Sequence, residues 1–168
     1  MSLETNQLLH PLSCKWVLYA HLPHDTDWSL DSYKRLIDIK VLEDMISLNN
    51  KLPDTMITNC MLFLMKNDIK PVWEDDDNCD GGCFSYKINN LEIVETWKEL
   101  SYLLLGETIT EDKELLSNIN GITVSPKRNF CIVKVWLKNC NYTESEVLNI
   151  PETMSKFGVL FKKHNPES

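Results

Sequence analysis

The sequence from residue 60 to residue 76 is CMLFLMKNDIKPVWEDD, an apolar run followed by a polar loop. The apolar run, 60–65, has the length and composition of a buried strand. The loop after it places Trp73 directly beside Glu74. An indole offers a π-face and a carboxylate offers two acceptor oxygens, so the pair suits a flat, cationic ligand with adjacent N–H donors. Trp28, in the loop-like segment 24–29, is the candidate for a second π-face opposite the first.

The segments on either side of this stretch predict an α+β fold. Strands are expected at 14–21, 33–39, 60–65, 83–88, 119–124, 130–137 and 158–163, and helices from 41 to just before Pro53, at 91–105 and at 143–156. Gly106 is expected to end the second helix, and a basic turn at 125–129 to join two strands into a hairpin. This order predicts a mostly antiparallel sheet with three helices packed on one face.

Length and charge limit the class of protein. At 168 residues the chain is long enough to bury roughly two-thirds of its unfolded surface. Residues 1–9 are expected to form a flexible tail and residues 10–168 a single domain. The formal net charge of -8 argues against broad binding to a phosphate backbone, which requires a basic surface. A ligand with few phosphates, or with its own positive charge, remains compatible with it.

Cysteine spacing and the absence of long apolar runs indicate the compartment. The six cysteines include no C-x-x-C pair, and the first residues lack the basic and apolar segments of a signal peptide. No apolar run approaches the length needed to span a bilayer. We therefore expect reduced thiols in the cytoplasm, with the nucleus as the alternative, and no membrane partner. No nucleophile–base–orienter set stands out, so we expect a protein that is not an enzyme and needs no cofactor.

An ordered set of motifs resembles a known family. The set comprises His10-Pro11-Leu12, Trp16, Trp28, Leu42-Glu43-Asp44, Trp73-Glu74-Asp75, Gly81-Gly82, Trp97, Leu105-Gly106-Glu107 and Trp136. In this order and at close to these spacings, the motifs resemble the eukaryotic translation initiation factor 4E family, which binds the cap of messenger RNA. One tryptophan beside a glutamate is a weak signal, whereas the ordered set over roughly residues 10–160 is a strong one.

The resemblance implies a fold, a ligand and a binding site. The fold would be a curved antiparallel sheet, shaped like a cupped hand, with three helices on its convex face. The ligand would be 7-methylguanosine linked through a triphosphate to messenger RNA. Trp28 and Trp73 would sandwich the base, Glu74 would accept its Watson–Crick N–H groups, and Trp136 would lie near the methyl group. The implied function is recruitment of capped messenger RNA for translation initiation.

By the same resemblance, Lys127 would lie near the phosphates, with Arg128 as a neighbouring basic candidate; the alternative is that both belong to a solvated turn. Methylation gives the purine a positive charge, so stacking on each indole gains a cation–π term of roughly 0.5–2 kcal/mol. A carboxylate that accepts from a charged base adds about 1.5–3 kcal/mol. An acidic protein can discriminate in this way, because the decisive charge is on the base.

Departures from the family pattern favour an alternative function. Cys83 and Phe84 stand where the family usually has an arginine and a tryptophan, which removes one phosphate contact. The family's C-terminal loop, which closes over the cap, is not matched before the chain ends, and the candidates to replace it are Lys162, Lys163 and His164. The alternative is therefore an adaptor or translational repressor that keeps the fold but has weak or lost cap affinity.

The resemblance also implies a surface for a protein partner. The partner would be a scaffold initiation factor of the 4G type, or a related protein with a helical motif, whose amphipathic helix would enter a groove. The residues of this surface would be His10, Pro11, Leu42, Ile46 and Tyr102. Ile46 stands where the family has a tryptophan, and Lys98 stands at a nearby apolar position. The alternative is that Leu42 and Ile46 simply face the sheet.

Three further interpretations follow from local patterns. Trp16, Trp97 and Tyr19 are interpreted as core aromatics. The segment 76–81 copies the opening of a calcium loop, but the twelfth position is Lys87 and the flanks resemble strands, so calcium is not expected. A metal-dependent enzyme that uses the carboxylates of residues 75–77 is the third function class.

Overall fold

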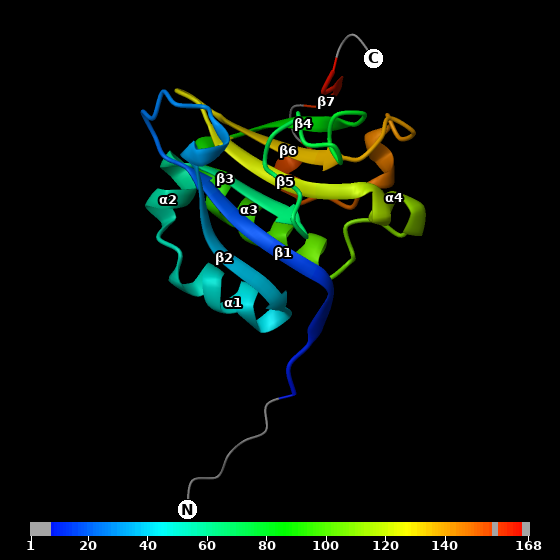
Figure 1. The fold of residues 1–168 in the computed structure, drawn as a ribbon, viewed down its shortest axis with the longest axis horizontal. Helices are drawn as coiled ribbons and strands as arrows, with labels where there is room; N and C mark the ends of the chain where they lie inside the picture. Colours follow the sequence, from blue (N-terminus) through cyan, green and yellow to red (C-terminus); the bar gives the residue numbers. More distant parts are fainter. Residues whose placement is uncertain (1–7, 156–157, 166–168) are drawn as a thin grey trace, which may run out of the picture.

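The computed structural model describes residues 8–155 and 158–165. Its centre is a curved sheet in the strand order β2-β1-β3-β5-β6-β4-β7, with every neighbouring pair antiparallel (Figure 1). The strands are β1 (Pro11–His21), β2 (Tyr33–Val41), β3 (Met61–Lys66), β4 (Gly82–Ile88), β5 (Ile119–Pro126), β6 (Cys131–Leu137) and β7 (Val159–Lys163). The predicted α+β class and the predicted β5–β6 hairpin are confirmed.

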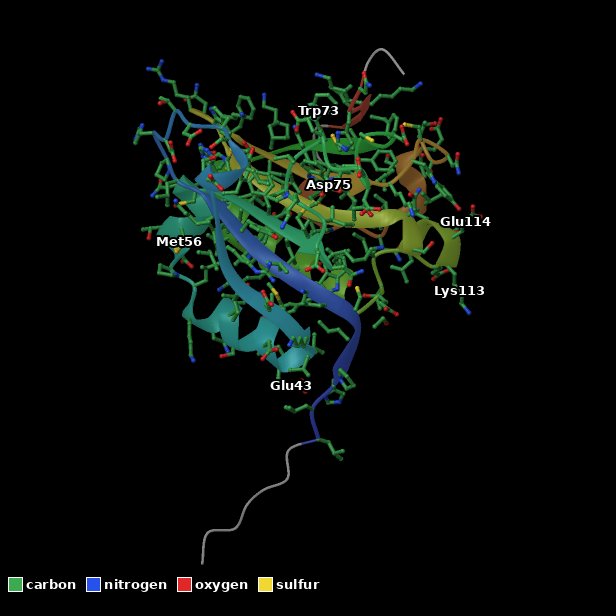
Figure 2. The ribbon with its side chains drawn as sticks, in the orientation of Figure 1. Glu43, Met56, Trp73, Asp75, Lys113 and Glu114 are labelled. Atoms are coloured by element: carbon green, nitrogen blue, oxygen red, sulfur yellow. The ribbon has the colours of Figure 1, made fainter. Side chains whose placement is uncertain are left out.

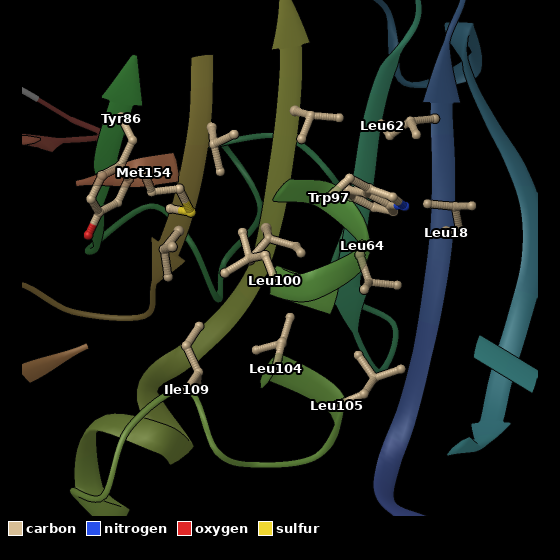
Figure 3. Packing of buried hydrophobic residues seen from close by; sticks show 14 of the residues in the cluster. Leu18, Leu62, Leu64, Tyr86, Trp97, Leu100, Leu104, Leu105, Ile109 and Met154 are labelled. Atoms are coloured by element: carbon tan, nitrogen blue, oxygen red, sulfur yellow. The ribbon is translucent and has the colours of Figure 1, made fainter. Parts of the chain in front are cut away.

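The helices cover one face of this sheet. They are α1 (Leu42–Lys51), α2 (Asp54–Asn59), α3 (Ile93–Leu105) and α4 (Lys113–Asn118). The long helix α3 directs apolar side chains, among them Trp97 and Leu100, toward Leu18 of β1 and Leu62 and Leu64 of β3 (Figure 3). This layer is the main core, as the interpretation of Trp16 and Trp97 as core residues predicts. No helix in the described ranges is long and apolar enough to cross a bilayer.

A buried polar bridge fixes α1 against α3. Asn49 of α1 accepts a hydrogen bond from Nε1 of Trp97 at 3.2 Å and donates one to Oγ of Ser101 at 3.1 Å. All three side chains are buried. Because each buried polar group finds a partner, the bridge adds orientation without the penalty of an unsatisfied group.

The opposite, concave face of the sheet carries a second, smaller apolar cluster. Side chains alternate between the two faces of a strand. Leu18 and Ala20 of β1 join the main core, so Val17, Tyr19 and His21 point to the concave face. The cluster comprises Val17, Tyr19, Phe63, Met65, Ile69 and Trp136. We call this cluster the concave floor, and Phe63 and Trp136 are its members that border the cavity described below.

The prediction of a helix at 143–156 is wrong. Residues 143–155, the described part of this segment, contain only the short 3-10 turns η3 (Ser145–Val147) and η4 (Glu152–Met154). Pro151 has no N–H to donate and disfavours a helical conformation of the residue before it, so a continuous helix cannot pass through it. The segment packs instead by hydrogen bonds to the chain before α4, where Asn149 N–H donates to the Ile109 carbonyl at 2.7 Å.

Two short helices, α2 and α4, were not predicted. Each has six residues, fewer than two turns, so no apolar period is visible in the sequence. Gly106 does end α3 as expected, but with a φ of -78°. The left-handed residue is the next one, Glu107, with a φ of 61°. A Cβ at Gly106 would lie 2.8 Å from the Tyr102 carbonyl, so close packing explains the glycine.

The predicted last strand is confirmed as β7, at the edge of the sheet beside β4. A Cβ at Gly82 would lie 2.6 Å from the Lys162 carbonyl oxygen and 2.8 Å from the Phe161 ring, so the glycine permits the close approach of β7. Phe161 in turn packs edge-to-face on Phe84, with ring centroids 5.3 Å apart. At the other end of the chain, residues 1–7 of the predicted tail lie outside the described residues, and Leu8 and Leu9 are exposed.

Candidate functional site

Four residues that the sequence predicts to bind a ligand border one cavity. Trp28, Trp73, Glu74 and Trp136 line a space of about 260 Å³ over the concave floor. Trp28 is 56% exposed and Trp73 is 43% exposed, so both indoles are open to a ligand. They come from the β1–β2 and β3–β4 connections. The other lining residues are Tyr33, Met61, Phe63, Pro71, Val72, Thr123, Ser125 and Lys134.

The Trp73–Glu74 loop is held in place by the carboxylate of Asp75 and the buried amide of Asn78. Asp75, beside Trp73 in the upper part of the molecule (Figure 2), accepts hydrogen bonds from Lys70 N–H at 2.8 Å and Asp77 N–H at 2.9 Å. The fully buried Asn78 donates to the carbonyls of Lys70 and Val72 at 3.1 and 2.9 Å. The backbone on both sides of Val72 is therefore fixed before any ligand arrives.

Asn120 ties this loop to the sheet. Its buried Nδ2 donates to the Asp77 carbonyl at 2.7 Å and to Oδ1 of Asn78 at 3.0 Å. Asn120 lies at a register shift of the β5–β6 pairing, where the regular alternation is interrupted. The side chain can therefore reach the loop that carries Trp73, although it comes from a central strand.

Asn120→Ala is expected to loosen the loop without disrupting the sheet. The substitution leaves the buried Oδ1 of Asn78 without this donor, which costs about 1–3 kcal/mol, and also frees the Asp77 carbonyl. Hydrogen exchange at residues 70–78 should accelerate, while exchange in α3 should not change. The exposed Asn129 is the matched control, and Asn129→Ala should leave both unchanged. Equal exchange in the Asn120→Ala variant and the unchanged protein would contradict this role.

Trp28 is supported from beneath by a histidine. The ring of His21 is stacked on the indole, with centroids 3.8 Å apart and planes within 5° of parallel. Tyr33 contacts both rings edge-on, at 5.3 Å from His21 and 6.4 Å from Trp28. The exposed indole therefore has one face covered by the protein and the other free.

Trp136 forms part of the cavity floor. Its Nε1–H donates to Oγ1 of Thr123 at 2.8 Å, and its ring meets Phe63 edge-on at 6.5 Å. Because the indole N–H is already used inside the protein, Trp136 offers a ligand only the hydrocarbon surface of its ring. That surface suits an apolar substituent such as a methyl group.

Glu74 is an available acceptor at the cavity wall. Its side chain is exposed, and among the described residues no group donates a hydrogen bond to it. Burial, together with the nearby Glu74 carboxylate, raises the pKa of Tyr33 above its usual value. The Tyr33 hydroxyl is therefore uncharged at neutral pH, and Glu74 is the anionic group of this wall.

Lys134 is a cavity residue that was not among the residues predicted from the sequence. It projects from β6 opposite Ser85 and Thr123 and lines the same space as Trp73 and Glu74. Within the described ranges, no carboxylate lies at ion-pair distance from its ammonium group. The signal was present in the sequence, because Lys134 is two residues from Trp136 and therefore on the same strand face.

Lys127 and Arg128 border a second, larger cavity instead of the first. This space of about 730 Å³ lies between the β1–β2 loop, the end of α2 and the β5–β6 turn. It shares Trp28, Met61 and Ser125 with the smaller cavity, so the two adjoin. The structure therefore separates the two predicted basic residues from Trp73 and Glu74 and places Lys134 there.

Comparisons with known proteins agree with this arrangement. A sequence model of the family described as "Eukaryotic initiation factor 4E" matches residues 11–166. The chain belongs to this family. Eukaryotic translation initiation factor 4E of Eremothecium gossypii is 31% identical over 162 residues, which cover 92% of this chain and 71% of that relative.

Solved structures of family members share the fold. Ascaris suum eIF4E-3 in complex with m7G cap has a TM-score of 0.76 and 25% identity, covering 95% of this chain and 93% of that chain. A schistosome eIF4E complexed with m7GpppA and 4E-BP has a TM-score of 0.73 and 26% identity, covering 83% and 77% of the two chains.

The last strand brings one of the three C-terminal candidates to the site. His164 packs against Trp136 with ring centroids 4.9 Å apart, and its backbone N–H donates to the Gly81 carbonyl at 3.0 Å. Lys162 and Lys163 are exposed. Burial, and then the charge of Lys134, lower the pKa of His164 to about 4. The imidazole beside Trp136 is therefore neutral at physiological pH.

The depressed pKa of His164 predicts a loss of stability in mild acid. The unfolded chain takes up a proton at this histidine near pH 6.5, whereas the folded chain does so only near pH 4. The free energy of unfolding should therefore fall as the pH drops through this window and be unaffected above it. Urea unfolding of His164→Gln should show a smaller decrease. The exposed His24 supplies the control, because His24→Gln should show the same decrease in the free energy of unfolding as the unchanged protein. If His24→Gln reduced this decrease as much as His164→Gln does, the acid sensitivity could not be assigned to His164.

The predicted partner residues lie at the start of β1 and on α1 and α3. The His10 backbone N–H donates to both carboxylate oxygens of Glu43, at 3.2 and 3.0 Å, and Leu42 N–H donates to the His10 carbonyl at 2.9 Å. Hydrogen bonds from the His10 side chain and backbone lower the pKa of Glu43 to about 2. Glu43 and Trp73 lie at opposite ends of the molecule (Figure 2).

The outer face of α1 is partly apolar. Met45 and Asn49 are the buried residues of this helix, while Ile46 is exposed and Leu42 half-buried. The alternative that Ile46 faces the sheet is therefore wrong. Tyr102 of α3 is half-buried and packs against the main core, and Pro11 is exposed opposite Val41.

The calcium-like segment serves a structural purpose. Asn78, its central amide, is fully buried and is used in hydrogen bonds with Lys70, Val72 and Asn120. Across the described residues, no group of three or more His, Cys, Asp or Glu side chains is arranged to hold a metal ion.

Proposed function

We propose that this protein binds the 7-methylguanosine cap of messenger RNA and recruits the message for translation initiation. The observation that carries the proposal is that Trp28 and Trp73, both exposed, border one cavity together with the carboxylate of Glu74, to which none of the described residues donates a hydrogen bond. Membership of the initiation factor 4E family supports it, as do the relatives whose structures contain m7G cap or m7GpppA.

The base is selected by its charge. The methylated purine is cationic and inserts between the two indoles, each face contributing roughly 0.5–2 kcal/mol of cation–π energy. Glu74 accepts from the adjacent N–H groups of the base, and the methyl group meets the ring of Trp136. Unmethylated guanine loses most of the stacking gain and forms weaker bonds with the carboxylate.

The phosphates meet two sets of cations. Lys134, inside the smaller cavity, binds the phosphates nearest the base, and Lys127 and Arg128, across the shared boundary at Ser125, bind those further along. Lys134 thereby supplies a positive charge to the phosphates, whereas Cys83, which stands where the family usually has an arginine, supplies none. These three cations are sufficient to bind the phosphates, even in a protein of net charge -8, because each acts at short range.

A scaffold protein of the 4G type, or another protein with a helical motif, occupies the face formed by His10, Pro11, Leu42, Ile46 and Tyr102. The exposed Ile46 and half-buried Leu42, one turn apart on α1, supply apolar contacts for an amphipathic helix. A schistosome relative solved with 4E-BP supports a protein partner. Because this face lies far from Trp73, partner and cap bind together.

Tryptophan fluorescence titrated with 7-methyl-GTP and with GTP tests the proposal. Stacking of the cationic base on Trp28 and Trp73 should quench the fluorescence, and 7-methyl-GTP should bind at least about tenfold more tightly than GTP. Equal affinity for the two nucleotides would exclude cap recognition.

The second candidate is an adaptor or repressor of the same fold with weak cap affinity. It is favoured by Cys83, whose buried thiol contacts Oγ of Ser85 at 3.7 Å and places no cation at this position of β4. Passage of the protein through 7-methyl-GTP resin, with retention on a resin that carries an amphipathic helical peptide, would favour this candidate. Retention on both resins supports the main proposal.

A further inference from the structure

His21 is an unusual residue to find beneath an exposed tryptophan. It is the last residue of β1, it is only 2% exposed, and it points to the concave face. Its ring lies parallel to Trp28 at 3.8 Å, which covers one whole face of the indole. A tryptophan in a surface loop usually samples several rotamers, whereas the indole of Trp28 is stacked on the imidazole of His21.

The same imidazole also holds the backbone next to the indole. Nε2 of His21 lies 2.8 Å from the carbonyl oxygen of Asp27, the residue before Trp28. A carbonyl oxygen only accepts, so Nε2 carries the hydrogen and donates it. His21 therefore fixes both the chain that enters Trp28 and the plane of its ring.

The rest of the loop is ordered by its own side chains. Asp25 accepts from Asp27 N–H at 2.9 Å, and Asp27 accepts from Ser29 N–H at 2.8 Å, two consecutive Asx turns. These bonds shape the backbone but do not touch the indole. Of the ring contacts that do, the parallel stack with His21 is the closest, and Trp28 also borders the smaller cavity.

We infer that His21 is a positioning residue for cap binding, which holds Trp28 with its free face turned toward Trp73 before the ligand arrives. The inference rests on the proposed function. Ordering one mobile side chain on binding lowers affinity, and a preformed face avoids that loss. Loss of His21 should therefore weaken binding of 7-methyl-GTP by about threefold to tenfold.

A double-mutant cycle tests the inference. His21→Ala should weaken 7-methyl-GTP binding by the stated factor in the otherwise unchanged protein, but by less than about twofold in the Trp28→Ala background. A purely structural role would lower affinity by the same factor in both backgrounds, and that result, or no loss in either, would overturn the inference. If His21→Ala does not fold, His21→Gln, which keeps a donor but has no ring, replaces it.

Two further variants separate the ring from its surroundings. His21→Phe keeps the stack and loses the bond to Asp27, so it should bind within about twofold of the unchanged protein. Binding by His21→Phe as weak as that of His21→Ala would overturn the stacking role. Leu30, exposed two residues after Trp28, borders neither cavity and is the matched control, and Leu30→Ala should not change affinity.

A ligand-free measurement distinguishes failure of this inference from failure of the proposed function. The order parameter of the Trp28 indole N–H, measured by nitrogen-15 relaxation, should be about 0.8 or higher in the unchanged protein and below about 0.6 in His21→Ala. An unchanged order parameter would overturn the inference even if the protein binds the cap. If the order parameter fell in His21→Ala but the unchanged protein did not prefer 7-methyl-GTP to GTP, the proposed function would be refuted and the role of His21 in holding Trp28 would stand.

Discussion

Trp73→Ala is expected to weaken the binding of 7-methyl-GTP by roughly fivefold to 150-fold, since stacking of one base is worth about 1–3 kcal/mol. The indole is 43% exposed and belongs to a loop, so its removal takes little from the core. The unfolding midpoint in urea should therefore change little. The loss should be much smaller for GTP, which has no positive charge to place over the ring.

The measurement is a fluorescence titration that follows the remaining tryptophans. Trp73→Phe is the first control, because a phenyl ring keeps a π-face and should recover part of the affinity. Leu91→Ala removes another exposed apolar side chain, one that borders neither cavity, and should have no effect on affinity. If Trp73→Ala bound 7-methyl-GTP as tightly as the unchanged protein, Trp73 would not form a wall of the binding site.

Glu74→Gln is expected to lower affinity for 7-methyl-GTP by roughly tenfold to 150-fold, which corresponds to the loss of a charge-assisted pair of about 1.5–3 kcal/mol. Glutamine has nearly the shape of glutamate, but its amide nitrogen donates where the base also donates. One of the two bonds is therefore replaced by a repulsive contact. The effect on GTP should be smaller, so the ratio of the two affinities should fall.

Neighbouring carboxylates provide a stringent control. Asp76 is exposed, two residues further along the same loop, and Asp76→Asn changes the net charge by the same amount as Glu74→Gln. Titrations of the two variants under identical conditions should show a loss only for Glu74→Gln. Equal losses would mean that the loop acts through its overall charge and that Glu74 does not contact the base.

Apolar and aromatic composition was enough to predict the central strands, because β3 and β5 are buried on both faces, and alternation indicated β4. The basic turn at 125–129 predicted the hairpin of β5 and β6. The helix expected at 143–156 does not form because Pro151, inside this segment, has no N–H to donate and disfavours a helical conformation of the residue before it. The six-residue helices α2 and α4 contain too few residues to show a period.

The site was only partly predictable. The family motifs predicted Trp28, Trp73 and Glu74, and the structure brings all three to one cavity. Lys134 was accessible to the same reasoning, because it shares a strand face with Trp136. The contact between His21 and Trp28 could not be predicted in this way. It depends on how the loop of residues 22–29 folds back over the end of β1, and no local sequence pattern indicates that path. Lys127 and Arg128 lie in a turn, whose direction the sequence leaves open.

The position of Lys134 in the floor of an acidic protein has a kinetic consequence. At a net charge of -8, the protein repels a triphosphate that approaches to within a Debye length of about 10 Å, and Lys134 attracts it only after entry. Added salt should therefore speed up association with 7-methyl-GTP, whereas it slows down association for basic RNA-binding proteins. Stopped-flow mixing across a salt series measures this rate, and slower capture at higher salt would show that attraction acts from afar. If association does become faster with added salt, the protein discriminates between ligands at contact, after a collision that its electric field opposes.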